Sequence, residues 1–215
     1  MTLQTPNGSI GSESINGDDY LHVKPVYGAT GTATLPSVTA GFPMRTVQDI
    51  ELLDGMNGTT GWTVLGNDAI NLATHANHVT GTASLEFDKV DGAAGTIFAG
   101  IQKTITSVDL SRYDIHSVVR TLIYVSATTN IAYAFVRLGT DASNYSQWQL
   151  VDSSITGALW QVFEVQLHSV NFTVVGTGWN QAAVTYAAVG LAFDAETDAL
   201  ADIKFDHLAV VGKLA

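Results

Sequence analysis

Residues 131–151 read IAYAFVRLGTDASNYSQWQLV and decide the fold class of this chain. Over 131–138 the residue types alternate as side chains do on the two faces of a β-strand. One face would carry Ile131, Tyr133, Phe135 and Arg137, and the other Ala132, Ala134, Val136 and Leu138. The turn signal Gly139-Thr140-Asp141 follows, and a second strand-like run spans 145–151. This stretch predicts two β-strands separated by a turn.

Strand-like runs separated by turn signals continue on both sides of this stretch. Further strand-like runs lie at 47–53, 62–65, 69–73, 82–88, 96–105, 115–126, 160–167, 184–193 and 202–211. Turn signals such as Asp54-Gly55 and Asp91-Gly92 separate most of them. No stretch keeps helical spacing over several turns. Roughly ten strands without intervening helices predict an all-β fold, an antiparallel β-sandwich of the jelly-roll type.

Residues 1–45 differ from the rest because Gly, Ser, Thr and Pro dominate and apolar residues are scattered. Residues 1–19 show no periodicity, whereas 20–27 alternate well enough for one strand, which Pro25 limits to an edge. We therefore expect an extended N-terminal arm, 1–45, followed by a single domain, 46–215. A lone strand is unstable, so this strand would pair with a neighbouring subunit or with the edge of the following domain. Its apolar contacts would be Leu21, Val23, Val26, Tyr27, Phe42 and Met44.

The composition excludes several classes of function. Of the 215 residues 46% are hydrophobic, which is enough for one sizeable core. The formal net charge is −11 and no Lys/Arg cluster is present, so nucleic acid is not an expected partner. No run approaches the roughly 18 apolar residues that span a bilayer, so a membrane is not expected either. The chain has no cysteine, which excludes disulfides and thiolate metal sites.

Four segments resemble non-catalytic carbohydrate-binding modules with the galactose-binding-like jelly-roll fold. They are DIELLDGMNGTTGWTVL at 49–65, GTASLEFD at 81–88, LWQVFEV at 159–165 and DIKFDHLAV at 202–210. The resemblance implies a structural calcium held by Asp206, by Asp54 or Glu51, and by backbone oxygens near 82–84, since calcium prefers oxygen ligands. The alternative is that Asp206 accepts hydrogen bonds from a neighbouring turn.

A second resemblance lies in the arm. Residues 17–45, GDDYLHVKPVYGATGTATLPSVTAGFPMR, resemble N-terminal segments of tailed-phage virion proteins, in which a short strand precedes a Pro-ended linker. A jelly roll behind such an arm is similar to capsid-decoration, head-fibre and tail-associated proteins. This resemblance implies a location in the virion, with capsid or tail subunits as partners.

The polar residues offer little for catalysis. His75 and His78 could share a metal ion, but no third ligand lies at a recognisable spacing, so a polar loop is favoured. Glu86 and Asp88 share a strand face, the minimal geometry for a glycosidase pair, yet an exposed sheet face explains both more simply. No serine nucleophile elbow or phosphate-binding loop occurs. We therefore do not expect an enzyme.

Aromatic residues are the candidates for glycan contact, because their rings can stack on sugars. Trp148 is the first choice, since Ser146, Gln147 and Gln149 surround it with polar residues, and Tyr133 and Trp179 are further candidates. Trp62 and Trp160 are expected in the core.

These observations lead to one expected function and one alternative. The first is a non-enzymatic phage virion protein whose jelly roll decorates the particle or binds host-surface glycans weakly. We expect it to be a homo-oligomer, with a trimer as the first choice. The alternative is a carbohydrate-binding module associated with a polysaccharide-degrading enzyme.

Overall fold

The computed structural model describes residues 49–92, 97–168 and 172–212, together with the backbone of three strands nearer the N-terminus. The chain divides into two compact units, residues 1–46 and 47–215. Within the described part, no helix has the length and hydropathy needed to cross a membrane.

The N-terminal unit contains a small antiparallel sheet in the order β1-β2-β3. Its strands are β1 Leu3–Thr5, β2 Gly8–Ile15 and β3 Asp18–His22. Residues 1–19 were interpreted as disordered or as a tail held by a partner, with no strand predicted, so β1 and β2 were missed. The sequence signal was Asn16-Gly17, a dipeptide that favours tight β-hairpin turns and stands between β2 and β3.

The residues predicted to anchor the arm are largely outside the described part of the chain. Leu21 lies in β3, for which only the backbone is described. The other five, Val23, Val26, Tyr27, Phe42 and Met44, lie outside the described residues. A role for this segment in binding a partner stays a prediction.

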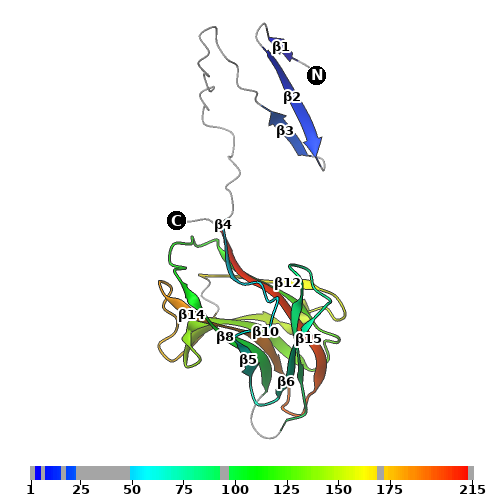
Figure 1. The fold of residues 1–215 in the computed structure, drawn as a ribbon, viewed down its shortest axis with the longest axis vertical. Coiled ribbons are helices and arrows are strands. Elements are labelled where there is room, and N and C mark those ends of the chain that lie inside the picture. The colour runs from blue at the N-terminus through cyan, green and yellow to red at the C-terminus, as the bar shows by residue number, and fades with distance from the viewer. Residues whose placement is uncertain are drawn as a thin grey trace. The chain divides into compact units, whose positions relative to one another are not determined.

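The larger unit is an all-β sandwich of two antiparallel six-stranded layers, as the alternation predicted (Figure 1). One layer, the β10 sheet, has the strand order β13-β11-β10-β14-β8-β5. The other, the β9 sheet, has the order β12-β9-β15-β7-β6, and β4 pairs with β15 beside it. The strands of the β10 sheet are β5 Trp62–Leu65, β8 Phe98–Val108, β10 Ile131–Asp141, β11 Asn144–Val151, β13 Phe172–Val175 and β14 Val184–Phe193. Those of the β9 sheet are β4 Asp49–Asp54, β6 Ala69–His75, β7 Ser84–Lys89, β9 Val118–Tyr124, β12 Gln161–Gln166 and β15 Leu200–Gly212.

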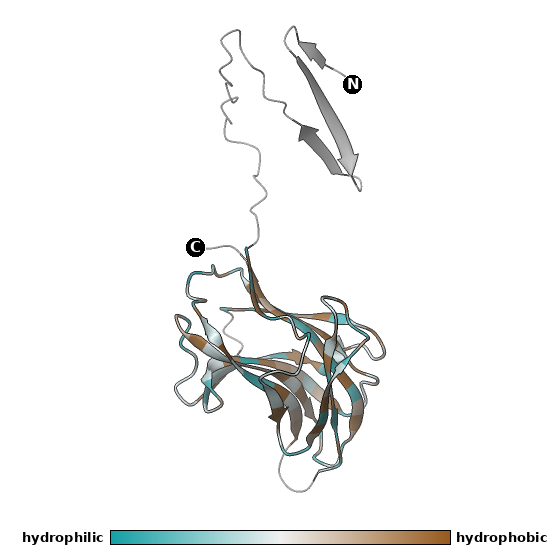
Figure 2. Ribbon diagram, in the orientation of Figure 1, coloured by the Kyte–Doolittle hydropathy of each residue, from teal (hydrophilic) through white to brown (hydrophobic). Residues whose placement is uncertain are grey.

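The core lies between the two sheets and is strongly aromatic. Phe87 of β7 and Phe205 of β15 stack with ring centroids 6.2 Å apart. Trp62 is 4% exposed, which confirms its predicted core position. Hydrophobic residues alternate with polar ones along the strands of both sheets (Figure 2). Burial of apolar area at roughly 25 cal/mol per Å² is the main force that holds such layers together.

Two irregularities change which side chains reach the core. The register of β10 against β14 shifts between Ile131 and Tyr133, so Ile131 turns inward and is 2% exposed. Ile131 was predicted to share a face with Tyr133, and this was wrong because a bulge reverses the alternation. A second shift, between Asp206 and Ala209 of β15, occurs where His207 adopts a φ of 55°.

Candidate functional site

The outer face of the β10 sheet is built from the side chains that the alternation turns away from the core. On β10 and β11 the paired outward residues include Arg137 with Gln147 and Gly139 with Tyr145. On β14 and β8 they include Tyr186 with Thr104 and Ala188 with Gln102. The outward positions of the edge strand β5 are Thr63 and Leu65.

Small residues occupy the middle of this face. Outward positions of β14 are Ala188, Gly190 and Ala192. A Cβ atom at Gly190 would lie 2.5 Å from the Ala99 carbonyl oxygen and 2.6 Å from Cζ of Phe135. Glycine at this position therefore lets β8 approach β14 and lets the Phe135 ring lie across the sheet.

A cavity of about 310 Å³ opens on the same face, and we call it the Tyr186 pocket. Its volume is at the small end of the usual range of small-molecule sites, about 300–1,000 Å³. Four parts of the sheet line it: Gly61 and Thr63 at β5, Gln102, Lys103 and Thr104 of β8, Thr140, Asp141 and Ala142 at the β10–β11 turn, and Tyr186 of β14. Segments far apart in the sequence thus converge on one hollow.

Tyr186 is held in the pocket by a hydrogen bond. Its hydroxyl donates to Oε1 of Gln102 at 2.9 Å, and the residue is 5% exposed. Burial raises the pKa of the Tyr186 phenol, and the nearby positive charge of Arg137 offsets part of that effect. The phenol is therefore neutral at physiological pH and serves as a hydrogen-bonding group.

The mouth of the pocket carries a carboxylate. Asp141 accepts hydrogen bonds from the side chain of Asn144 and from the backbone N–H of Ser143. The Asn144 bond lowers the pKa of Asp141 most, followed by the Ser143 bond. Asp141 is thus ionised at neutral pH, with two of its acceptor positions already in use.

This arrangement suits a small polar ligand. Tyr145 and Tyr186 lie with ring centroids 6.1 Å apart. Amide, hydroxyl and carboxylate groups surround the pocket and can exchange hydrogen bonds with ligand hydroxyls. Polar side chains thus dominate the lining, and Tyr186 is its one aromatic residue.

The three aromatic residues predicted for glycan contact differ in burial and in the face of the sheet on which they lie. Trp148 is fully buried, pairs with the inward Val136 and packs edge-to-face on Trp179, with centroids 5.1 Å apart. Trp148 as an exposed platform was wrong, because its face of β11 is the core face. Trp179 is half-buried against the same core. Tyr133 does lie on the outer face of the β10 sheet and is half-buried.

The sequence reasoning missed Tyr186, Gln102 and Tyr145. One available signal was Arg137, which alternates with Tyr133 and Phe135. A charged residue is rarely buried in a sandwich core, so its face of β10 had to be the outer one. The pairing of β10 with β11 then places Tyr145 outside and Trp148 inside.

The three carboxylates predicted to bind calcium have separate partners. Asp206 is fully buried and accepts from the backbone N–H groups of Val79 and Thr80, both at 2.8 Å, and from the Thr80 hydroxyl at 2.9 Å. Asp54 binds Nζ of Lys103 at 2.6 Å, and Glu51 pairs with Arg112. The residues that the structure describes contain no group of three or more His, Asp or Glu that could hold a metal ion.

The three carboxylates are therefore not brought together into one site. Asp206 instead fixes the loop between β6 and β7, which is the alternative considered for it. A structural calcium stays a prediction that chelation can test.

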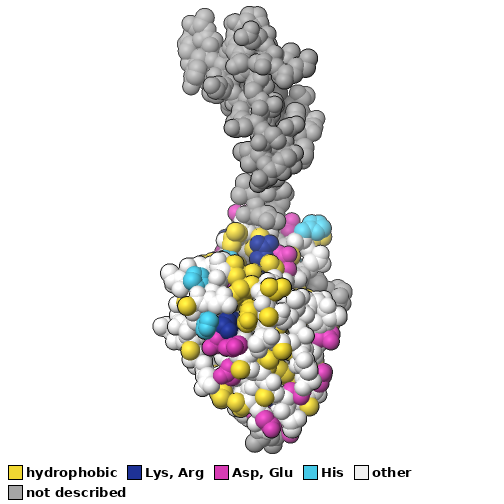
Figure 3. Space-filling view, turned by 90° about the vertical axis from the view of Figure 1, so that its right-hand side faces the viewer, with side chains coloured by type: hydrophobic (Ala, Val, Ile, Leu, Met, Phe, Trp, Pro, Cys, Tyr) yellow, Lys and Arg dark blue, Asp and Glu magenta, His cyan; other side chains and the backbone are white. Residues whose placement is uncertain are grey.

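The outer face of the β9 sheet has a different character. Figure 3 views the side of the domain that carries β12, β15 and β6, where hydrophobic side chains form a band. By register, Val162 and Leu52 lie on this face, and each is 52% exposed. Nε of Arg120 donates to Oε1 of Glu164 at 2.7 Å, and Glu164 lies on the same face two residues along β12 from Val162.

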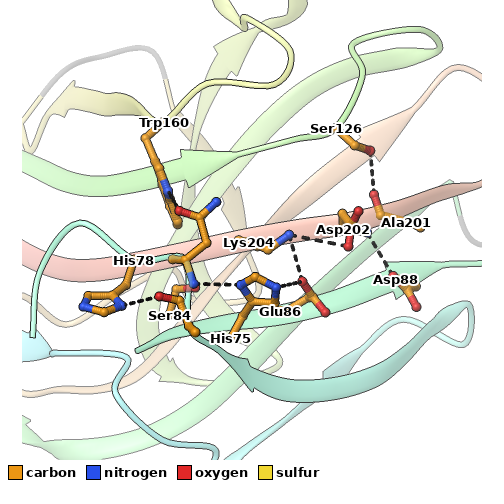
Figure 4. Close-up of polar contacts among 12 residues, drawn as sticks. His75, His78, Ser84, Glu86, Asp88, Ser126, Trp160, Ala201, Asp202 and Lys204 are labelled. Atoms are coloured by element: carbon orange, nitrogen blue, oxygen red, sulfur yellow. Dashed lines mark hydrogen bonds and ion pairs between the residues drawn. The ribbon is translucent and has the colours of Figure 1, made fainter. Parts of the chain in front are cut away.

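A connected set of polar contacts crosses this second face (Figure 4). Nε1 of Trp160 donates to Oδ1 of Asn77 at 3.0 Å, and the Asn77 N–H donates to Nδ1 of His75 at 2.9 Å. Nε2 of His75 lies 3.7 Å from Oε2 of Glu86, which Nζ of Lys204 approaches to 2.8 Å. Trp160 is half-buried and outward, so its predicted core position was wrong.

The remaining polar candidates have structural partners as well. Asp88 accepts from Nδ2 of Asn71 at 2.8 Å and from the Asp202 N–H at 3.0 Å, so it ties three strands together. His78 contacts the Ala76 carbonyl at 2.7 Å, whereas His75 faces Glu86. The two imidazoles thus have different partners, in keeping with the polar-loop interpretation of this segment.

Comparison with known proteins supports the fold. No protein-family model and no curated protein sequence matches this chain. Among solved structures, the family 11 carbohydrate-binding module from Clostridium thermocellum, in complex with a β-1,3-1,4-mixed-linked tetrasaccharide, superposes with a TM-score of 0.56 at 12% identity. The match covers 77% of this chain and 96% of the module.

Two further structures show the same architecture. A family 30 carbohydrate-binding module matches with a TM-score of 0.55 at 12% identity, over 76% of this chain and 99% of the module. An exo-β-agarase matches with a TM-score of 0.53 at 10% identity, over 78% of this chain and 26% of the enzyme. These likenesses establish the jelly-roll fold of carbohydrate-binding modules. Nothing in them indicates a virion protein.

Proposed function

We propose that residues 47–215 form a non-catalytic carbohydrate-binding domain whose site is the Tyr186 pocket. The observation that carries the proposal is the pocket itself, with a buried tyrosine fixed by Gln102 on the outer face of the β10 sheet. The fold shared with two carbohydrate-binding modules supports it. This is the alternative function suggested by the sequence, and it displaces the virion role as the better supported one.

The chemistry of the pocket fits a sugar ring. Tyr186, the aromatic residue of the lining, is 5% exposed, so the polar groups around the pocket would carry most of the recognition. Gln102, Thr63 and Thr104 can hydrogen-bond to the ring hydroxyls. A single site of this size would bind weakly and would gain avidity when several copies are displayed together.

The number of carboxyl groups that line the pocket favours binding without catalysis. A glycosidase needs two carboxyl groups on opposite sides of the scissile bond. The pocket is lined by one, Asp141, and its partners are Asn144 and Ser143. We expect bound glycan to be released unchanged, which chromatography of the glycan after prolonged incubation would check.

A glycan array probed with multivalent protein tests the proposal. Gln102→Ala should weaken binding about tenfold, the effect of losing one well-formed polar contact. Thr63→Trp should block the pocket from an exposed position on an edge strand. The matched control is Val162→Trp on the outer face of the β9 sheet, which should leave binding unchanged. Binding that survives both pocket variants would place the site elsewhere.

A further inference from the structure

Arg137 differs from every other basic side chain in the described part of the chain. The other five, Lys89, Lys103, Arg112, Arg120 and Lys204, each have a carboxylate oxygen within 4.0 Å. Arg137 is 7% exposed, and no described carboxylate lies within that distance of it. A buried charge is costly unless it is paired.

Three aromatic rings and one amide surround the Arg137 guanidinium. Its Cζ lies 4.4 Å from the ring centroid of Phe135, 4.7 Å from that of Tyr145 and 4.9 Å from that of Phe98. Its Nε–H donates to Oε1 of Gln147 at 2.8 Å. The rings orient the cation and stabilise it in part, but they supply no opposite charge.

The remaining donors of Arg137 form a recognition element. A guanidinium has five N–H groups. The Nε–H of Arg137 donates to Gln147, and a further hydrogen bond from the guanidinium to the Tyr186 hydroxyl is among the effects that lower the pKa of that phenol. The two terminal NH₂ groups form a planar fork that matches a carboxylate through two parallel hydrogen bonds. Packing between aromatic rings holds this fork in place before any ligand arrives, which lowers the entropic cost of binding.

Arg137 also adjoins the Tyr186 pocket. It pairs across the sheet with Ala188, two residues from Tyr186, and its charge acts on the Tyr186 phenol. Of the carboxylates described, Asp141 lines this pocket, at the β10–β11 turn beyond Gly139. Lys103, the other charged residue of the lining, is neutralised by Asp54. Arg137 is not part of the pocket lining, so a ligand must extend past Tyr186 to bring an anionic group to Arg137 while its neutral end lies near Asp141.

We infer that Arg137 binds the carboxylate of an acidic sugar, so that the glycan recognised at this face contains uronic acid residues. The inference rests on the proposed glycan-binding function and names its ligand class. The net charge of −11 opposes an anionic polymer at long range. That repulsion is largely screened beyond about 8 Å at physiological salt, whereas the direct contact with Arg137 is not.

The test compares polysaccharides that differ only in charge. Polygalacturonate, alginate and glucuronoxylan are each assayed beside their carboxyl-reduced forms, with mixed-linkage β-glucan as a neutral reference, at physiological salt. We expect at least one acidic polymer to bind, and its reduced form to bind about 10- to 100-fold more weakly, as for the loss of charge-assisted hydrogen bonds.

Variants separate recognition from structure. Arg137→Met places an apolar chain among the three rings, so it should fold with at least wild-type stability and lose the preference for the acidic form. Arg137→Lys keeps the charge without the fork and should recover part of the preference. The matched control is Arg120→Gln, which removes an arginine paired with Glu164 on the opposite sheet and should change nothing.

The outcomes distinguish this inference from the proposed function. Equal binding of acidic and reduced forms, or binding of the neutral reference alone, would overturn the role of Arg137 and leave the glycan site standing. An equal loss of acidic and neutral binding in Arg137→Met would also overturn it. Absence of binding to every polysaccharide would refute the proposed function itself.

Discussion

The Asp206→Ala substitution isolates the contact that fixes the loop between β6 and β7. It removes three hydrogen bonds, two of them from the backbone N–H groups of Val79 and Thr80. A hydrogen bond to a charged group contributes about 1.5–3 kcal/mol when its donor is buried. Val79 is 51% exposed, so water can replace part of the loss. We count about 1 kcal/mol per bond and expect a destabilisation of about 3 kcal/mol.

The assay is equilibrium unfolding in urea with a parallel thermal melt. For a domain of this size 1 kcal/mol corresponds to about 2–4 °C, so the midpoint should fall by roughly 6–12 °C. Asp152→Ala is the matched control, because Asp152 is an exposed carboxylate that accepts one bond from the Ser153 N–H. It should leave the midpoint nearly unchanged.

Two results would refute this reasoning. A midpoint of Asp206→Ala equal to that of the wild type would show that the three bonds contribute nothing. A wild-type protein that loses as much stability on chelation as Asp206→Ala loses by substitution would show that Asp206 acts through calcium. The same pair of melts therefore tests the calcium prediction.

Three further predictions concern the sandwich. Spectrophotometric titration should find Tyr113 and Tyr186 ionising later than exposed tyrosines, because burial raises the pKa of both phenols. Their contribution to stability is present below the ordinary tyrosine pKa of 10.0 and is lost as pH rises through the folded-state pKa, and a uniform titration would contradict this. Gly190→Ala should cost about 2–3 kcal/mol in chemical denaturation, since its Cβ would meet Ala99 and Phe135, and a neutral effect would show that the strands of the β10 sheet can shift. Trp148→Ala should cost about 3–5 kcal/mol, as for a buried core aromatic, whereas an unchanged unfolding midpoint would show that its indole is not packed.

The sequence predicted the sandwich because alternation is a local signal. Successive residues of a strand point to opposite faces, so hydrophobic and polar residues alternate along it, and turn residues mark its ends. Local signals fail where the geometry departs from that period. The bulge in β10 reverses the face of Ile131, and no residue type there marks it. Strand β13 was absent from the prediction although Phe172–Val175 pairs with β11.

The candidate site was less accessible to sequence reasoning for two physical reasons. Alternation assigns residues to two faces without saying which face is buried, and so Trp148 was taken as exposed. The second reason is distance along the chain. The Tyr186–Gln102 bond joins residues 84 positions apart, and the Asp206–Thr80 bond joins residues 126 apart. Only the strand order of the two sheets brings such residues together.

The central claim is that glycans bind on the outer face of the β10 sheet at the Tyr186 pocket. The most direct measurement is a titration of the isotope-labelled protein with the preferred glycan, followed by NMR of the backbone amides. The account predicts saturable shifts concentrated at Thr63, Gln102 and Tyr186, with none at His75 or Lys204 on the β9 sheet. Shifts centred on His75 and Lys204, with the pocket amides unmoved, would contradict it.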